Sequence, residues 1–419
     1  MTKTAIVVSH THWDREWYET FQQFRLRLVR LMDKLLDILD SDPAYRYFML
    51  DGQTIVLDDY LQIRPEREAD LRRQVQQGRL LIGPWHLLPD EFLVSGEALV
   101  RNLLLGERTA RRFGAKMKVG YTPDPFGHIS QLPQILRGFG MDSTAMRRGL
   151  DDQSTELLWQ SPDGSTVLLC YLRDGYDNAA RLPVHDADAF VAEVRRLCDS
   201  LAPHATTDYV LLMNGVDHME PVPELPRAIA SAAALAPELS LIHGTLPMYL
   251  DAVKASLALD MDNLPPGPQK LQTVRGELRS PKRHHLLPGV LSARMWIKQR
   301  NTHIQTVLER WAEPFSTVAA LAPFGPRGPA RRRSSPFVAV RRERRRCYAT
   351  SDEGATRGRD GLRRDSGHPR WQWRGFSHLH KRPSVAGLEV PARKPSPRFH
   401  LWLQHRPGAS GDGYPFRLG

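Results

Sequence analysis

The densest group of chemically versatile side chains in this sequence lies near its amino terminus. His10, His12 and Asp14 follow the apolar, β-branched run 4–9, and Trp17 comes soon after them. Such a run has the composition of a buried parallel strand, and open α/β sheets bind ligands beyond the carboxyl ends of their strands. This density of imidazole and carboxylate groups favours one metal ion or one polar substrate over histidines that are merely part of a core.

Polar and aromatic residues follow later predicted strands in the same way: Trp85 after 80–82, Asp124, Phe126 and His128 after 118–122, Arg147 and Arg148 after 143–146, and Asp217 and His218 after 209–213. The carboxyl ends of parallel strands meet on one face, as in a β/α barrel. We therefore expect these side chains to converge on one site.

Two kinds of chemistry fit this set. Asp124 and Asp217 could be the two carboxylates of a glycosidase. Mixed ligation by His12, Asp14, Asp124 and a histidine of the pair His284-His285 would suit zinc. Spacing alone does not choose between a glycosidase and a metal-dependent hydrolase that acts on amides or esters.

The elements that must position these residues alternate between strand and helix. Amphipathic periodicity predicts helices at 21–40, 96–113 and 187–201, between the short apolar strands. This alternation predicts an α/β fold with a parallel sheet covered by helices. A long helix is predicted at about 290–322, and its apolar face needs partner helices.

Composition separates the body of the chain from its carboxyl-terminal part. The chain has 419 residues and a net charge of +11, and the excess of positive charge falls after residue 324. Arginine-rich residues 324–419 lack periodicity, so we expect a basic tail that is disordered or comes from a change of reading frame.

The three cysteines are too few for a disulfide framework. With no apolar signal core or membrane-length apolar run, we expect a cytoplasmic protein without a membrane partner.

The motifs as a set resemble the N-terminal part of glycoside hydrolase family 38, the zinc-dependent retaining α-mannosidases of the bacterial type. The residues that carry this resemblance are His-Thr-His-Trp-Asp (10–14), Asp-Pro-Phe-Gly-His (124–128), Arg-Arg-Gly (147–149), Asn-Gly-Val-Asp-His-Met-Glu-Pro (214–221), and Gly-Glu-Leu-Arg (276–279) with His285 and Ser-Ala-Arg (292–294). They occur in the family's order over residues 1–323.

The resemblance implies a fold and a domain organisation. We expect a seven-stranded, mainly parallel catalytic domain over 1–260, similar to a distorted β/α barrel, and the start of a three-helix bundle over 261–323. Family members continue into β-sandwich domains, so this chain would be a truncated form that lacks part of the support of its cleft.

The resemblance also implies roles for individual residues. The implied zinc ligands are His12, Asp14, Asp124 and His285, and His285 is preferred to His284 because it keeps the family's distance to Gly289 and Arg294. Asp124 would also be the nucleophile, and Asp217 the general acid/base. Trp17, Phe126 and Arg148 would bind the substrate, and His10 would support the ligands.

The expected activity is hydrolysis of terminal α-D-mannosides with retention, through a covalent glycosyl-aspartate and with Zn²⁺ as cofactor. The expected partner is a mannose-containing oligosaccharide or a small mannoside, and self-association stays open. One alternative is a metal-dependent deacetylase or amidase on a similar scaffold. Another, a nucleic-acid binder acting through the basic tail, is disfavoured because the body carries no matching basic surface.

Overall fold

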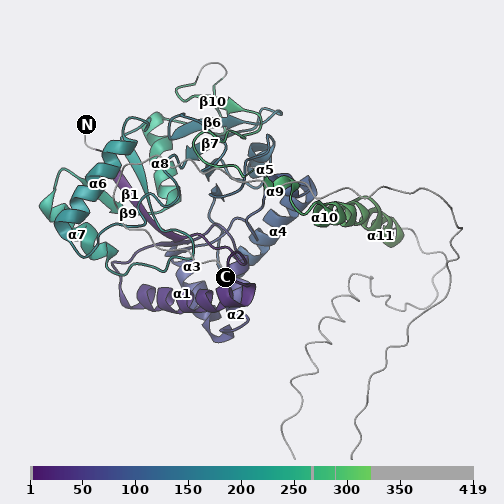
Figure 1. Cartoon of the computed structure of the whole chain (residues 1–419), viewed down its shortest axis with the longest axis horizontal. Helices are drawn as coiled ribbons and strands as arrows, with labels where there is room; N and C mark the ends of the chain where they lie inside the picture. Colours follow the sequence, from purple (N-terminus) through teal and green to yellow (C-terminus); the bar gives the residue numbers. More distant parts are fainter. Residues whose placement is uncertain (1–2, 266–268, 288, 322–419) are drawn as a thin grey trace, which may run out of the picture. The chain divides into compact units, whose positions relative to one another are not determined.

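The computed structural model describes residues 3–265, 269–287 and 289–321 (Figure 1). Within these ranges, ten strands form two five-stranded sheets, and helices follow most of the strands. The predicted α/β class with mainly parallel strands is confirmed. The predicted seven-stranded, barrel-like arrangement is not confirmed, because the described strands lie in two sheets rather than in one closed barrel.

The first sheet is built around β1. Its strands are β1 (Thr4–Thr11), β2 (Phe48–Leu50), β3 (Leu80–Leu81), β8 (Tyr209–Asn214) and β9 (Ser240–His243). β1 pairs in parallel with β2, β8 and β9, and β2 pairs in parallel with β3. The register sets Ser9 opposite Asn214 and His10 opposite Met49. The carboxyl ends of these strands therefore reach the same edge of the sheet.

The second sheet has the strand order β10-β6-β7-β5-β4. Its strands are β4 (Gly120–Thr122), β5 (Ser143–Met146), β6 (Glu156–Gln160), β7 (Thr166–Tyr171) and β10 (Thr273–Arg275). Only β6 and β7 pair antiparallel among the strands that the structure describes. The turn between them contains Gly164, whose φ of +91° favours glycine.

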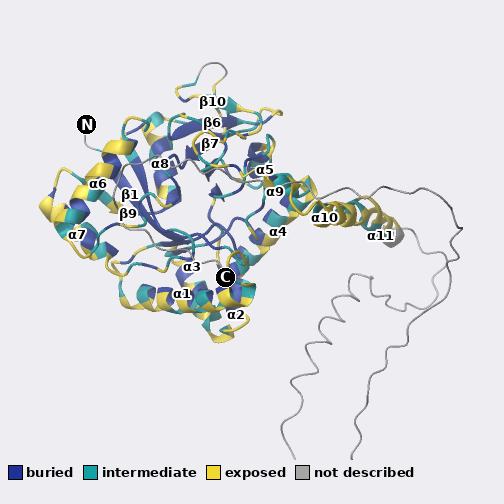
Figure 2. Ribbon diagram, in the orientation of Figure 1, coloured by how far each residue is buried: buried dark blue, intermediate teal, exposed yellow. Residues whose placement is uncertain are grey.

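The helices are α1 (Phe21–Ser41), α2 (Ile55–Leu61), α3 (Glu68–Gln76), α4 (Gly96–Phe113), α5 (Leu132–Gly138), α6 (Ala187–Leu201), α7 (Leu225–Leu235), α8 (Leu246–Leu257), α9 (Gly289–Ser292), α10 (Met295–Val307) and α11 (Glu313–Leu321). The inward faces of α1 to α8 are buried and their outward faces exposed, whereas the strands are largely buried (Figure 2). On α1, for example, Phe24, Leu28, Leu31 and Leu35 are buried, as the amphipathic pattern predicts.

Helix α4 packs closely on the loop that follows β3. A Cβ atom at Gly106 would lie 2.0 Å from the carbonyl oxygen of Pro84 and 2.6 Å from the carbonyl carbon of Trp85. Asn102 Oδ1 accepts hydrogen bonds from the N–H groups of His86 and Leu87. The absence of a side chain at Gly106 thus brings the helix against the loop that carries the buried Trp85.

The predicted long helix at 290–322 is divided into segments. Arg294, with a φ of +49°, separates α9 from α10, and a π-helical turn over Leu308–Ala312 separates α10 from α11. Among the described residues of α10, none is buried. Arg101 of α4 forms an ion pair with Glu313, and Ser95 donates to Glu309 at 2.6 Å, so polar contacts hold this segment.

The predicted domain boundaries at 260/261 and 323/324 stay predictions, and residues 324–419 lie outside the described residues. Across the part of the chain that the structure describes, no helix is both long and apolar enough to cross a membrane.

Candidate active site

Strands β1 and β8 deliver His12 and Asp217 side by side. The N–H of His12 donates to the carbonyl of Val216 at 3.3 Å, and the N–H of His218 donates to the carbonyl of His12 at 2.8 Å. These hydrogen bonds extend the parallel pairing of the two strands, with His12 directly opposite Asp217. The predicted meeting of these residues at one edge of a sheet is therefore observed.

Asp51 fixes the imidazole of His12. Its carboxylate is fully buried and accepts a hydrogen bond from His12 Nδ1 at 2.9 Å. The other oxygen accepts from the N–H of Trp13 at 2.7 Å and from Gln53 Nε2 at 2.8 Å. With Nδ1 engaged, His12 Nε2 is free to bind another group and lies 3.7 Å from Asp14 Oδ2.

The pKa values of His12 and Asp14 reflect this concentration of carboxylates. Burial lowers the pKa of His12, but the charges of Asp51, Asp14 and Asp124 outweigh burial and raise it to about 10. Burial raises the pKa of Asp14 to about 6, opposed by His12 and reinforced by the neighbouring carboxylates. His12, Asp14 and Asp124 therefore interact electrostatically, although they come from two different sheets.

Asp124 follows β4 and is held by Arg148, which follows β5. Arg148 donates from Nε and Nη2 to Asp124 Oδ1, at 3.1 and 2.5 Å. The guanidinium lies over the ring of Phe126, 5.2 Å from its centroid. Arg148 therefore contacts both the proposed nucleophile and the proposed sugar platform.

The loop after Asp124 is tied to the rest of the protein on two sides. His128 and Leu278 exchange two backbone hydrogen bonds of 3.0 Å, and a Cβ atom at Gly127 would lie 3.0 Å from the carbonyl oxygen of Leu278. The fully buried carboxylate of Glu91 accepts from His128 Nδ1 at 2.7 Å and from the N–H of Ile129 at 2.9 Å. These contacts explain why the loop requires glycine and histidine at these positions.

Tyr176 contacts Asp217 from the loop after β7. Its hydroxyl donates to Asp217 Oδ1 at 2.8 Å, and its ring centroid lies 5.2 Å from that of His12. Burial, with the neighbouring carboxylates Asp124 and Asp217, raises the pKa of Tyr176, so the hydroxyl stays protonated and donates. His10 Nε2 hydrogen-bonds the carbonyl oxygen of Tyr176 at 2.7 Å, so His10 supports this loop.

The two neighbouring histidines near residue 285 occupy different environments. His285 is exposed, and its carbonyl oxygen accepts a hydrogen bond from Arg148 Nη1. His284 is half-buried; its Nε2 bonds the carbonyl of Arg173 at 2.9 Å and its Nδ1 accepts from Arg147 Nε at 3.4 Å. In the residues that the structure describes, no three His, Cys, Asp or Glu side chains are already placed to hold a metal ion. The zinc ligand set thus stays a prediction.

Aromatic side chains lie next to Asp217. Trp17 is 62% exposed, and its ring lies 6.5 Å from that of His218 and 4.9 Å from that of Tyr18. His218 stacks on the buried Phe24 at 4.2 Å. An indole held on a packed aromatic base and open to solvent can bind the apolar face of a sugar, as predicted for Trp17.

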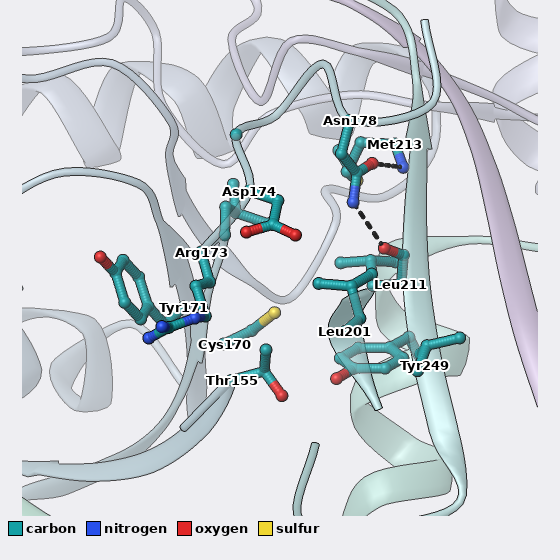
Figure 3. Close-up of a pocket in the computed structure, with 13 residues that line it drawn as sticks. Thr155, Cys170, Tyr171, Arg173, Asp174, Asn178, Leu201, Leu211, Met213 and Tyr249 are labelled. Atoms are coloured by element: carbon teal, nitrogen blue, oxygen red, sulfur yellow. Dashed lines mark hydrogen bonds between the residues drawn. The ribbon is translucent and has the colours of Figure 1, made fainter. Parts of the chain in front are cut away.

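A small cavity between β7 and β8 is separate from this site (Figure 3). Its volume of about 20 Å³ is sufficient for one water molecule. Cys170, Leu211 and Tyr249 line it, and Asn178 closes one side by bonding the carbonyl of Leu211 at 3.1 Å. It is too small for a sugar, and none of the predicted site residues is part of its lining.

The N-terminal domain model of glycosyl hydrolases family 38 matches residues 2–273. The chain belongs to glycosyl hydrolase family 38. It is 41% identical over 331 residues to a putative mannosylglycerate hydrolase of Halalkalibacterium halodurans, an alignment that covers 75% of this chain and 36% of that protein. It is 29% identical over 187 residues to mouse alpha-mannosidase 2x, across 41% of this chain and 16% of that protein.

Solved structures of this family are also similar. The crystal structure of an alpha-mannosidase from Enterococcus faecalis V583 matches with a TM-score of 0.61 and 38% identity, and covers 66% of this chain and 31% of that chain. The family 38 chain thus spans about a third of the length of its bacterial relatives.

Asp51 and Tyr176 are two residues in contact with His12 and Asp217 that the sequence reasoning did not single out. Asp51 follows the short strand β2, so the rule that drew attention to other strand ends would also have found it. Tyr176 lies in the loop after β7 among ordinary turn residues, and its role depends on the loop conformation that His10 supports. No local signal in the sequence marks it.

Proposed function

We propose that this family 38 chain carries the catalytic domain of a zinc-dependent α-mannosidase that retains the anomeric configuration and acts in the cytoplasm. The observation that carries the proposal is the convergence of two carboxylates, Asp124 and Asp217, on the buried pair His12 and Asp51. Both carboxylates follow parallel strands, and both are contacted by a residue that holds them in place.

The two carboxylates have different partners, which supports different roles. Asp124 is bound through one oxygen by Arg148, so the other oxygen is left to attack the anomeric carbon. Asp217 is contacted by the hydroxyl of Tyr176 and is the candidate to protonate the departing glycosidic oxygen. In the second step Asp217 would take a proton from water, which attacks the same carbon and releases Asp124. Mannose and the free aglycone are then the products.

Four side chains would hold zinc: His12, Asp14, Asp124 and His285. The donor chemistry at the first two fits, because Asp51 occupies His12 Nδ1 and leaves Nε2 available, 3.7 Å from Asp14 Oδ2. A carboxylate behind a ligand histidine is a common means of orienting it. Bound zinc would act as a Lewis acid that holds the sugar hydroxyls next to the reacting carbon.

The proposed substrates are small α-D-mannosides and the terminal mannose of oligosaccharides. Trp17, Phe126 and Arg148 would contact the sugar, consistent with an exposed indole and a ring under a guanidinium. The similarity to a protein named putative mannosylglycerate hydrolase favours a small mannoside.

A mechanism-based label tests this proposal. The full chain, supplied with zinc, is incubated with 2-deoxy-2-fluoro-α-D-mannosyl fluoride and digested for mass spectrometry. The expected result is one added fluoromannosyl group on the peptide that contains Asp124, and no adduct in Asp124→Asn. An Asp217→Asn variant is the control, because activated fluorides do not require an acid for departure. Labelling elsewhere would refute the nucleophile, and acetate release from an acetylated sugar without any adduct would support a deacetylase.

A further inference from the structure

The two halves of the candidate site belong to two sheets that no strand pairing joins. His12 follows β1 of the first sheet, and Asp124 follows β4 of the second. Among the described strands, β3 is an edge of the first sheet and β4 an edge of the second, and they do not pair with each other. Arg148 holds Asp124, but it follows β5 and so belongs to the same sheet. The place of Asp124 relative to His12 therefore depends on side-chain contacts that cross from one sheet to the other.

Glu91 connects the loop after β3 to the loop after β4. Its carboxylate accepts hydrogen bonds from His128 Nδ1 at 2.7 Å and from the N–H of Ile129 at 2.9 Å. Within the described ranges, one other hydrogen bond reaches this loop from the first sheet, from the N–H of Phe126 to Asp90 at the longer distance of 3.4 Å. Glu91 is thus the principal link from the first sheet to the loop that carries the proposed nucleophile.

Burial makes this link hard to replace. Glu91 is 2% exposed and His128 is 0% exposed, so water cannot take the place of either partner. A carboxylate only accepts, so Nδ1 of His128 carries the hydrogen. Nε2 of His128 is buried and has no partner among the described residues. Without Glu91 the imidazole would have no hydrogen bond at either nitrogen, and the ring would have to move to find one.

A movement of His128 would be passed on to Asp124, because the segment between them is short and packed. The N–H of Gly127 donates to the carbonyl of Pro125 at 2.9 Å, which closes a tight turn. A Cβ atom at Gly127 would lie 3.1 Å from the ring of Phe92, in the same loop as Glu91. The two loops are therefore in close contact, and the turn has little freedom to absorb a displacement.

On its other side, the loop of Glu91 is joined to the residues that hold His12. The N–H of Trp85 donates to the carbonyl of Gly52 at 3.1 Å, and the N–H of Thr54 donates to the carbonyl of Trp85 at 2.9 Å. Gly52 directly follows Asp51, whose carboxylate fixes the imidazole of His12. A continuous set of hydrogen bonds thus runs from the support of one half of the site to the support of the other.

We infer that Glu91 is a positioning residue of the candidate site, which acts through His128 to set the place of Asp124 relative to His12. This inference rests on the proposed function, in which Asp124 is the nucleophile and shares zinc with His12. Loss of Glu91 should misplace the nucleophile and separate the two zinc ligands. The acid Asp217 follows β8 and makes no hydrogen bond to either loop within the described residues, so its step should be unaffected.

Two measurements on the full chain at saturating zinc test the inference. Trapping by 2-deoxy-2-fluoro-α-D-mannosyl fluoride reports attack by Asp124 and needs no acid. Glu91→Ala is expected to lower the trapping rate at saturating reagent at least about tenfold, with a smaller change in the half-saturating concentration, because a misplacement of about 1 Å can cost about 100-fold. Glu91→Gln keeps an acceptor oxygen for Ile129, so its rate should be intermediate.

The second measurement does not depend on turnover. Competition with a chromophoric chelator should show that Glu91→Ala weakens zinc binding at least about tenfold, as when a residue that supports a ligand is lost. The double variant Glu91→Ala/His128→Ala should be trapped no more slowly than the slower single variant, because both changes remove the same link. If Glu91→Ala does not fold, Glu91→Gln provides the same comparisons.

Glu156→Ala is the matched control. Glu156 is also 0% exposed and lies in the second sheet, where it accepts from the N–H of Thr206 at 2.7 Å and from Thr155 Oγ1 at 2.7 Å. It makes no hydrogen bond to the loop of Asp124 within the described residues. This variant should lose stability comparably, but trap the reagent and bind zinc as the wild type does, at a temperature where circular dichroism shows each variant folded.

The outcomes separate this inference from the proposed function. Wild-type trapping and zinc binding in folded Glu91→Ala would overturn the inference and leave the mannosidase proposal intact, as would an equal loss in Glu156→Ala. A double variant whose loss equals the sum of two independent losses would show that Glu91 does not act through His128. A wild type that forms no adduct and binds no zinc would overturn the mannosidase proposal, and the inference with it.

Discussion

The carboxylate of Asp51 accepts a hydrogen bond from His12 Nδ1 at 2.9 Å across a separation of 39 residues. The same carboxylate binds the backbone of Trp13, so it fixes both the ring and the chain at the end of β1. Residues that orient a ligand histidine in this way affect metal affinity without touching the metal.

Asp51→Asn is therefore expected to weaken zinc binding about 10- to 100-fold. The amide keeps the size of the side chain but loses its charge and one acceptor oxygen. Competition with a chromophoric chelator measures the zinc affinity of the full chain, and Asp42→Asn, at a partly exposed position outside the site, is the control. Zinc affinity equal in both variants and the wild type would show that Asp51 has only a structural role.

Tyr176→Phe is expected to lower kcat about tenfold on an unactivated α-mannoside, with a smaller change in KM. The hydroxyl orients Asp217, and an acid that is free to rotate protonates the leaving oxygen less often. On an activated fluoride, which needs no acid, the variant should approach the wild-type rate. An equal loss of rate on both substrates would assign Tyr176 to sugar binding instead.

Gly106→Ala is expected to lower the free energy of unfolding by about 1–3 kcal/mol, because the new methyl group would collide with the backbone at Pro84 and Trp85. Urea denaturation measures the effect. Gly138→Ala in α5 is the matched control, since no atom lies within 4 Å of the added Cβ there. The control should be neutral or slightly stabilising. A loss of stability in the control equal to that of Gly106→Ala would contradict the packing argument.

His243 contributes a pH dependence to stability. It is buried beside Ser9, whose hydroxyl lies 3.1 Å from Nε2, and burial lowers the pKa of His243 to about 4. In the unfolded chain the value is about 6.5. Above pH 6.5 both states are neutral, so His243 has no effect. As the pH falls from 6.5 to 4 the unfolded state alone gains the proton, and the free energy of unfolding decreases by about 1–3 kcal/mol.

His243→Asn should remove that part of the decrease, whereas His185→Asn, at an exposed position, should not. Urea titrations at pH 7 and pH 4.5 measure the difference between each variant and the wild type. If the free energy of unfolding of His243→Asn decreased between pH 7 and pH 4.5 as much as that of the wild type, His243 would not be a source of the pH dependence.

The parts of the site that lie at strand ends could be predicted because strand composition and the residues that follow are both local. His12, Asp124 and Asp217 follow β1, β4 and β8, as the sequence indicates. The contact of Tyr176 with Asp217 and the anchoring of Arg147 by His284 could not be predicted, because both depend on loops that meet only in the folded chain.

The sheet arrangement was also only partly predictable. The pattern of alternating strands and helices correctly indicates parallel pairing, but it overlooks the hairpin of β6 and β7. Its turn, Pro162-Asp163-Gly164, was a recognisable signal. β9 is short and has a single buried residue, and β10 has no buried residue, so neither has the apolar alternation by which strands are recognised.

The exposed aromatic residues of the carboxyl-terminal helices have a spectroscopic consequence. Trp296 is 67% exposed and Trp311 is 58% exposed, whereas Trp13, Trp85 and Trp159 are buried. An indole in water emits at longer wavelength than one in an apolar core. Any polypeptide that covers α10 and the π-helical turn would therefore shift the emission of these two side chains to the blue, and fluorescence would detect it as it binds.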